Sequence, residues 1–250
     1  MEQFQIKRLI PIDLFGWDVS FTNASLFMVI AMAIIPLFFL VAMNRRSLVP
    51  GRLQSTAELS YEFIANMVRE NVGEAGMKYF PWVFTIFMFI LTANLLGMMP
   101  FAIVGAHPFT VTSQFTVTGV MAIISFGIVL VVGFWRHGFH FFSLFIPQGT
   151  PKVLLPLIFL IELLSFMVRP FSLALRLFVA MIAGHILVEV FGSFVVSGIN
   201  AGGVMGPLVS LLSFVFIVGV MALELLVCAI QAYVFALLTS LYINDAVNLH

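Results

Sequence analysis

Residues 172–187 read SLALRLFVAMIAGHIL, an apolar stretch that contains Arg176. The pKa of a guanidinium lies above about 12, so this side chain stays charged even in hydrocarbon. An arginine at the centre of a bilayer costs roughly 2.5 to 3.5 kcal/mol on insertion scales, so it is kept only where it has a function or a partner. Arg176 is therefore the first candidate functional residue, a fixed positive charge inside a membrane.

The composition of the whole chain is that of a polytopic membrane protein. Hydrophobic residues make up 62% of the 250 residues and charged residues only 9%, against about 25% charged in soluble domains. The 11 basic and 11 acidic residues cancel, so the charge indicates no nucleic-acid partner, and we expect none. No small-residue cleavage site follows a short apolar region near the N-terminus, so we expect no removable signal peptide.

The apolar runs predict an all-α membrane protein, a single polytopic domain over residues 1–250, with about five membrane-crossing helices. The segments expected, in chain order, are an outer N-terminal segment at 1–24, a first span at 25–43, an amphipathic surface helix at 50–76, spans at 80–101 and 116–135, and two long helices at 151–197 and 203–242.

The segment at 50–76 is too charged to cross the membrane. Its apolar residues form one helical stripe, made of Leu53, Ala57, Tyr61, Ile64 and Val68. We expect this helix to lie along the membrane surface or on a partner.

Basic residues indicate the orientation of the chain. Arg45 and Arg46 follow the first span, Arg136 follows the third, and Lys78 precedes the second, whereas the loop HPFTVTSQ at 107–114 has no lysine or arginine. By the positive-inside rule, the basic ends face the cytoplasm or matrix. The N-terminus is then outside, and five crossings return the C-terminus to the cytoplasmic side.

The last two segments are unusually long. As straight helices, residues 151–197 would extend roughly 70 Å and residues 203–242 roughly 60 Å, about twice the hydrocarbon core. Either each helix breaks, with Pro170 as the kink in the first, or both are strongly tilted. The turn-rich sequence SGINAGG at 197–203 predicts that they form an antiparallel hairpin.

Four ionisable candidates lie on the first hairpin helix. Glu162 and Arg176 are fourteen residues apart, which places them within about 40° of one face. His185 is nine residues beyond Arg176, about half a revolution away, and Glu189 follows one turn later. The helix therefore has two polar faces toward opposite membrane halves, with Arg176 between them.

The last helix carries Glu224 and Gln231, seven residues apart on one face. Two polar entries separated by a fixed charge are what a proton pathway with two half-channels needs, because carboxylates and imidazole exchange protons whereas arginine repels them. No carboxylate lies one turn from Arg176, so its counter-charge must come from elsewhere, with a different chain as a natural source.

Each candidate also has a structural interpretation. Glu162 would be a snorkelling residue at the interface, His185 a hydrogen-bonded packing residue, and Gln231 an interhelical hydrogen bond. Asn94 is expected to make a buried hydrogen bond between helices, and Arg169 is either structural or lipid-facing. No HExxH pattern or third ligand accompanies His185, and no nucleotide-binding fingerprint occurs, so we expect no metal, no cofactor and no nucleotide site.

The chain strongly resembles subunit a of the rotary, proton-driven ATP synthase, also called subunit 6. The resemblance covers nearly the whole chain. It rests on RPFSLALRLFVAMIAGH at 169–185, ANLLGMMPF at 93–101, LIEL at 160–163 and LELLVCAIQAYVFALLTSLYINDAVNLH at 223–250.

The resemblance implies that Arg176 faces the carboxylates of a rotating ring of c subunits, with Gln231 beside it. It also implies that Glu162 serves a cytoplasmic half-channel, and that His185 and Glu224 serve the other. It further implies b-type peripheral stalk subunits as partners and a tilted hairpin that curves around the ring. A departure from many relatives is Ala180 in place of asparagine.

We therefore expect a proton-conducting stator subunit in a bacterial inner membrane, with the mitochondrial inner membrane as the alternative. Proton rather than sodium coupling is inferred, since the resemblance implies that ion choice is set mainly in the ring. The alternative functions are a self-contained proton-coupled secondary transporter and an assembly scaffold. A transporter predicts an inverted repeat, which the sequence does not show.

Overall fold

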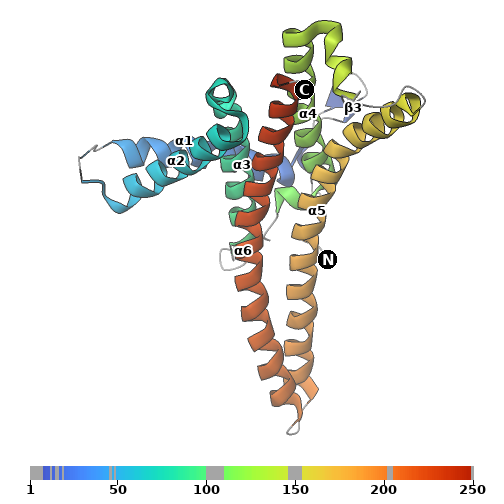
Figure 1. The fold of residues 1–250 in the computed structure, drawn as a ribbon. Coiled ribbons are helices and arrows are strands. Elements are labelled where there is room, and N and C mark those ends of the chain that lie inside the picture. The colour runs from blue at the N-terminus through green and yellow to red at the C-terminus, as the bar shows by residue number, and fades with distance from the viewer. Residues whose placement is uncertain are drawn as a thin grey trace.

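A computed structural model describes residues 8–11, 13–14, 17–18, 20–44, 47, 49–99, 110–145, 154–201 and 205–248 (Figure 1). Six α-helices dominate this part of the chain: α1 (Asn23–Met43), α2 (Arg52–Val72), α3 (Phe80–Met98), α4 (Phe115–His137), α5 (Leu155–Ala201) and α6 (Met205–Val247). Short 3₁₀ helices lie between them at η2 (Glu74–Lys78), η4 (Val111–Ser113) and η5 (Gly138–Phe145).

The N-terminal segment adds two short antiparallel strand pairs. Strand β1 (Arg8–Ile10) pairs with β4 (Phe21–Thr22), and β2 (Asp13–Leu14) pairs with β3 (Trp17–Asp18). The Thr22 hydroxyl then accepts a hydrogen bond from the Ser25 backbone N–H, which caps the start of α1.

Five of the six helices, all except α2, are long and apolar enough to cross a membrane. The all-α membrane fold with five crossing helices is therefore confirmed. The predicted span at 80–101 is a helix as far as Met98, and its last residues, Pro100 and Phe101, lie outside the described part of the chain.

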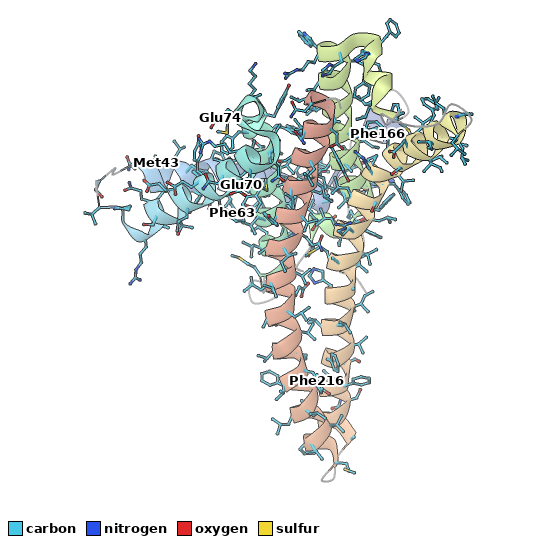
Figure 2. The ribbon with its side chains drawn as sticks, in the orientation of Figure 1. Met43, Phe63, Glu70, Glu74, Phe166 and Phe216 are labelled. Atoms are coloured by element: carbon cyan, nitrogen blue, oxygen red, sulfur yellow. The ribbon has the colours of Figure 1, made fainter. Side chains whose placement is uncertain are left out.

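Helices α5 and α6 form the predicted antiparallel hairpin and lie side by side along most of their length, with the tip extending beyond the other helices (Figure 1). Helix α5 is not broken at Pro170; it continues from Leu155 to Ala201 and bends near Phe166, about one turn earlier (Figure 2). Proline thus bends this long helix without ending it.

The hairpin loop is shorter than predicted. Residues 197–201 are helical, and Gly202 and Gly203 lie outside the described residues. The reason is local packing: a Cβ on Gly198 would lie 2.7 Å from the backbone oxygen of Gly206, so the glycine lets the two helices approach closely. This close packing outweighs the turn-like composition of the segment.

Helix α2 packs against α3 and α6 of the same chain. Ala57, Ile64 and Val68 of the predicted stripe are buried, whereas Leu53 and Tyr61 are exposed. The buried stripe is therefore narrower than predicted from the sequence.

The core of the protein is built around α3 and the C-terminal half of α6. Fully buried side chains there include Val83 and Ile90 on α3 and Phe235 and Ile243 on α6. By contrast, most of the apolar surface of α5 and of the N-terminal half of α6 is exposed. The core thus fixes one end of the hairpin and leaves its remaining surface open.

Candidate functional site

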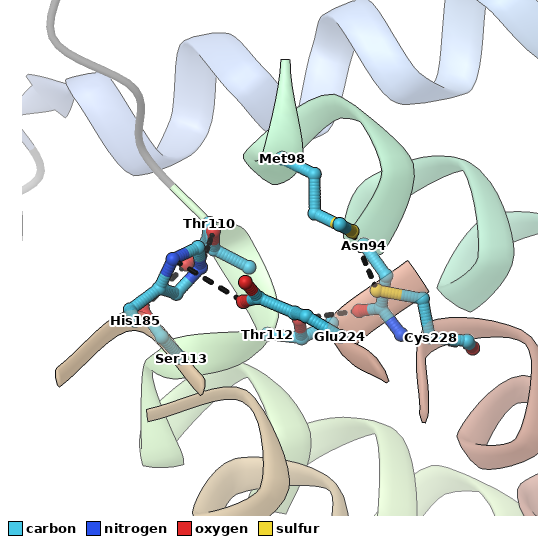
Figure 3. A network of polar contacts seen from close by, with 8 residues as sticks. All are labelled: Asn94, Met98, Thr110, Thr112, Ser113, His185, Glu224 and Cys228. Atoms are coloured by element: carbon cyan, nitrogen blue, oxygen red, sulfur yellow. Dashed lines mark hydrogen bonds and ion pairs between the residues drawn. The ribbon is translucent and has the colours of Figure 1, made fainter. Parts of the chain in front are cut away.

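His185 on α5 and Glu224 on α6 face each other across the hairpin (Figure 3). The imidazole Nδ1 lies 3.4 Å from Oε1 of Glu224, and the Glu224 side chain is only 4% exposed. This Oε1 accepts no hydrogen bond within the described chain, so the imidazole is its close polar neighbour at ion-pair distance. The hairpin therefore brings together two groups that can exchange a proton.

Gly184 makes room for this approach. A Cβ at this position would lie 2.9 Å from both Cδ and Oε1 of Glu224, closer than non-bonded carbon and oxygen atoms normally come. Only glycine leaves the space in which the carboxyl group lies against α5. The residue just before His185 is thus part of the geometry of the pair.

Thr110 contacts the opposite side of the imidazole. Its Oγ1 lies 2.5 Å from Nε2 of His185 (Figure 3). Thr110 is buried, at 4% exposure, and directly precedes η4. The ring of His185 therefore lies between a hydroxyl group and a carboxyl group from two different parts of the chain.

The η4 turn is itself held by buried hydrogen bonds. Thr112 Oγ1 donates to Asn94 Oδ1 on α3 at 2.6 Å, and Asn94 Nδ2 donates to the backbone oxygen of Cys228 on α6 at 3.5 Å. The expectation that Asn94 makes a buried hydrogen bond between helices is confirmed. This network links α3, η4 and α6 around the His185–Glu224 pair (Figure 3).

Arg176 lies apart from this network. Its side chain is exposed, and it makes no hydrogen bond or ion pair with the described residues. Along α5 it is nine residues from His185, roughly 13 Å on an ideal helix. Gln231, half-buried on α6, is seven residues from Glu224, so it lies at about the same level of the antiparallel hairpin.

The two remaining candidates lie on α5. Glu162 is half-buried and about 21 Å along the helix from Arg176, and Glu189 is half-buried one turn beyond His185. The structure thus joins His185 to Glu224 and leaves Glu162 and Arg176 outside that contact. Within the described residues, no group of three or more histidine, cysteine, aspartate or glutamate side chains is placed to hold a metal ion.

Comparison with known proteins identifies the family. The family model for the ATP synthase A chain matches residues 25–244. The chain belongs to this family. ATP synthase subunit a of Sphingopyxis alaskensis is 59% identical, and that of Rhizorhabdus wittichii 58%, each over 100% of this chain and 96% of the relative. The subunit of Rhizobium leguminosarum is 52% identical over 98% of this chain and 96% of the relative.

In this member of the ATP synthase A chain family, two polar contacts are not predictable from the patterns in the sequence. The first is the contact of Thr110 with His185. Thr110 belongs to the segment at 107–114, where the lack of basic residues indicated only the orientation of the chain. The three hydroxyl residues at 110–113 were the one sequence feature that pointed to a polar contact there. Arg169 was given no partner, yet it forms an ion pair with Asp245. Both contacts join residues more than seventy positions apart, which helical periodicity does not reveal.

Proposed function

We propose that this chain is the proton-conducting stator subunit of an ATP synthase membrane sector, with Arg176 as its electrostatic gate. As a member of the ATP synthase A chain family with five apolar helices, it is a multi-pass inner-membrane component of the proton-translocating synthase.

The proposal rests on Arg176, which has no hydrogen bond or ion pair with the described residues. A permanent cation on a membrane helix is exposed and has no acidic partner among the described residues. Because an unpaired charge in hydrocarbon is costly, we infer that a different chain supplies its counter-charge. Carboxylates on a ring of c subunits moving past α5 and α6 supply such a charge.

The polar groups on either side of Arg176 provide two separate half-channels. His185 and Glu224 line the one toward the outer side, and Glu162 lines the one toward the cytoplasm. Gln231 lies at the level of Arg176, and Glu189 extends the outer polar face. A proton enters one half-channel, neutralises a ring carboxylate, travels with the ring, and leaves through the other after Arg176 drives its release. Each elementary charge that crosses 100 mV releases about 2.3 kcal/mol, so several protons drive each ATP made.

The exposed apolar surface of the hairpin indicates that a large apolar partner binds there. Outward-facing apolar side chains on the two helices include Val179, Ile186, Leu223, Leu226 and Ile230. Exposed apolar side chains of this kind are typical of a site for lipid or for another membrane helix. We assign it to the c-subunit ring, with b-type stalk subunits contacting other parts of the chain. In this arrangement the N-terminus is outside and the C-terminus cytoplasmic.

Reconstitution tests the proposal against its rivals. The chain is placed in vesicles alone and together with its ring and stalk subunits, and proton flux is measured under an imposed potential. We expect proton flux only in the assembled sector. Proton flux through the chain alone would favour a self-contained transporter. If proton flux through the assembled sector did not depend on Arg176, His185 or Glu224, a scaffold would be favoured. A sodium series in the same assay separates proton from sodium coupling.

A further inference from the structure

We propose that Thr110 is a positioning residue for proton transfer, whose hydroxyl group holds the imidazole of His185 with Nδ1 toward Glu224. The inference rests on the proposed function, in which His185 and Glu224 form part of the outer proton path. It adds to that path a residue from the segment between α3 and α4, outside the hairpin. Thr110 contacts His185 and acts through it.

The first support is the arrangement of the ring. Nδ1 lies 3.4 Å from Glu224 Oε1, and Nε2 lies 2.5 Å from Thr110 Oγ1, so the two nitrogens face different groups (Figure 3). A neutral imidazole has one N–H donor and one acceptor nitrogen, whereas an imidazolium has two donors. A ring that relays protons therefore changes the hydrogen-bonding character of its nitrogens during each cycle.

A hydroxyl group suits both states of Nε2. When Nε2 carries no proton, Thr110 donates its O–H to the nitrogen; when Nε2 is protonated, Thr110 Oγ1 accepts from it. Only the hydroxyl hydrogen has to rotate. The imidazole therefore keeps Nδ1 toward Glu224 throughout the cycle, and the orientation of the ring does not depend on its charge.

The second support is that Thr110 is itself held in place. A Cβ on Gly97 of α3 would collide with the Thr110 side chain, so glycine there provides the space this side chain fills. Ser113 Oγ donates to the backbone oxygen of Thr110 at 2.7 Å, and Thr112 is tied to Asn94. The β-branched side chain also has few χ1 rotamers. The hydroxyl therefore has a fixed position against which the ring is oriented.

Two pairs of variants test the role of the hydroxyl group. Thr110→Val keeps the shape and removes the hydroxyl, whereas Thr110→Ser keeps it; Thr110→Ala with Thr110→Ser gives a second comparison if the valine variant does not assemble. We expect ATP-driven proton pumping by the assembled synthase to fall roughly threefold to tenfold without the hydroxyl, as for a lost buried hydrogen bond. The serine variant should keep most of the rate. Thr116→Val, at an exposed position on α4, should keep the full rate.

The same substitutions in a His185→Ala background separate positioning from packing. If Thr110 acts through His185, Thr110→Val should cause no further loss once the imidazole is gone. The inference would be overturned if Thr110→Ser lost as much pumping as Thr110→Val, or if Thr110→Val caused the same loss in the His185→Ala background as in the wild type. If His185→Ala lost most pumping but Thr110→Val pumped at the wild-type rate, the role of Thr110 would be overturned and the proposed outer path would stand. Wild-type pumping in His185→Ala would instead overturn the proposed outer path itself, and the role of Thr110 with it.

Discussion

Arg169 on α5 and Asp245 on α6 form an ion pair, with Nη1 of the arginine 2.6 Å from Oδ2 of the aspartate. The guanidinium carbon also lies 5.1 Å from the centre of the Tyr242 ring and 5.6 Å from that of Phe166. These contacts join the two hairpin helices at the end opposite the tip, directly before Pro170. We infer that they fix the alignment of α5 and α6 on which the His185–Glu224 contact depends.

The Arg169–Asp245 pair is expected to contribute modestly to stability. Its side chains are 28% and 36% exposed, and exposed ion pairs contribute about 0.2 to 1 kcal/mol. Asp245→Asn should therefore lower the thermal midpoint of the purified synthase sector by a small amount. Arg169→Lys should lose part of the ring contacts as well, because an ammonium group lacks the planar guanidinium face.

Exchanging the two charges checks that the pair itself matters. Arg169→Asp combined with Asp245→Arg should recover part of the stability that each single change loses. Strict additivity of the two single losses would show that the ion pair makes no net contribution.

Gly184→Ala should impair proton flux because the added methyl group occupies the space of the Glu224 carboxyl group. The matched control is Gly192→Ala on the same helix, where a Cβ would meet nothing within 4 Å. Both changes gain about 1 kcal/mol of helix propensity, so a difference in flux reports the clash alone. Pumping is measured in the assembled synthase. Equal pumping by both variants would mean that the carboxyl group does not need this position.

Much of the fold follows from simple patterns in the sequence. Apolar runs longer than a bilayer predict the five crossing helices, and the short segment between the last two predicts their hairpin. The antiparallel pairing then places His185 near Glu224. The predicted length of the hairpin loop was wrong, because the loop is shortened by the close packing of Gly198 on Gly206, a tertiary contact that local sequence does not show.

The polar contacts of the site were harder to predict. Helical periodicity shows which residues share a face of one helix, but the contacts of Thr110 with His185 and of Arg169 with Asp245 join separate segments. These contacts depend on how far neighbouring helices are shifted along their axes relative to each other, which a single sequence does not specify. Arg176 was easier to identify, because a charge in an apolar run is visible without knowledge of the fold.

Thiol labelling tests the assignment of Glu162 to the cytoplasmic half-channel. Cysteine replaces residue 162 in a Cys228→Ser background, and a water-soluble thiol reagent is added from either side of sealed vesicles. We expect labelling from the cytoplasmic side, because residue 162 is half-buried and lies on the far side of Arg176 from His185. Labelling only from the outer side would place the residue in the wrong half-channel.

Glu162→Gln should slow turnover of the synthase without uncoupling proton flux from ATP synthesis, and Glu162→Asp should slow turnover less.

Arg176→Ala tests whether Arg176 is the charge that separates the two half-channels. ATP synthesis and ATP-driven pumping are measured on synthase whose subunit content matches the wild type. We expect both activities to be abolished while assembly is largely retained. Arg176→Lys should not restore them, because a buried ammonium group can lose its proton. Synthesis at the wild-type rate in the alanine variant would show that Arg176 does not separate the half-channels.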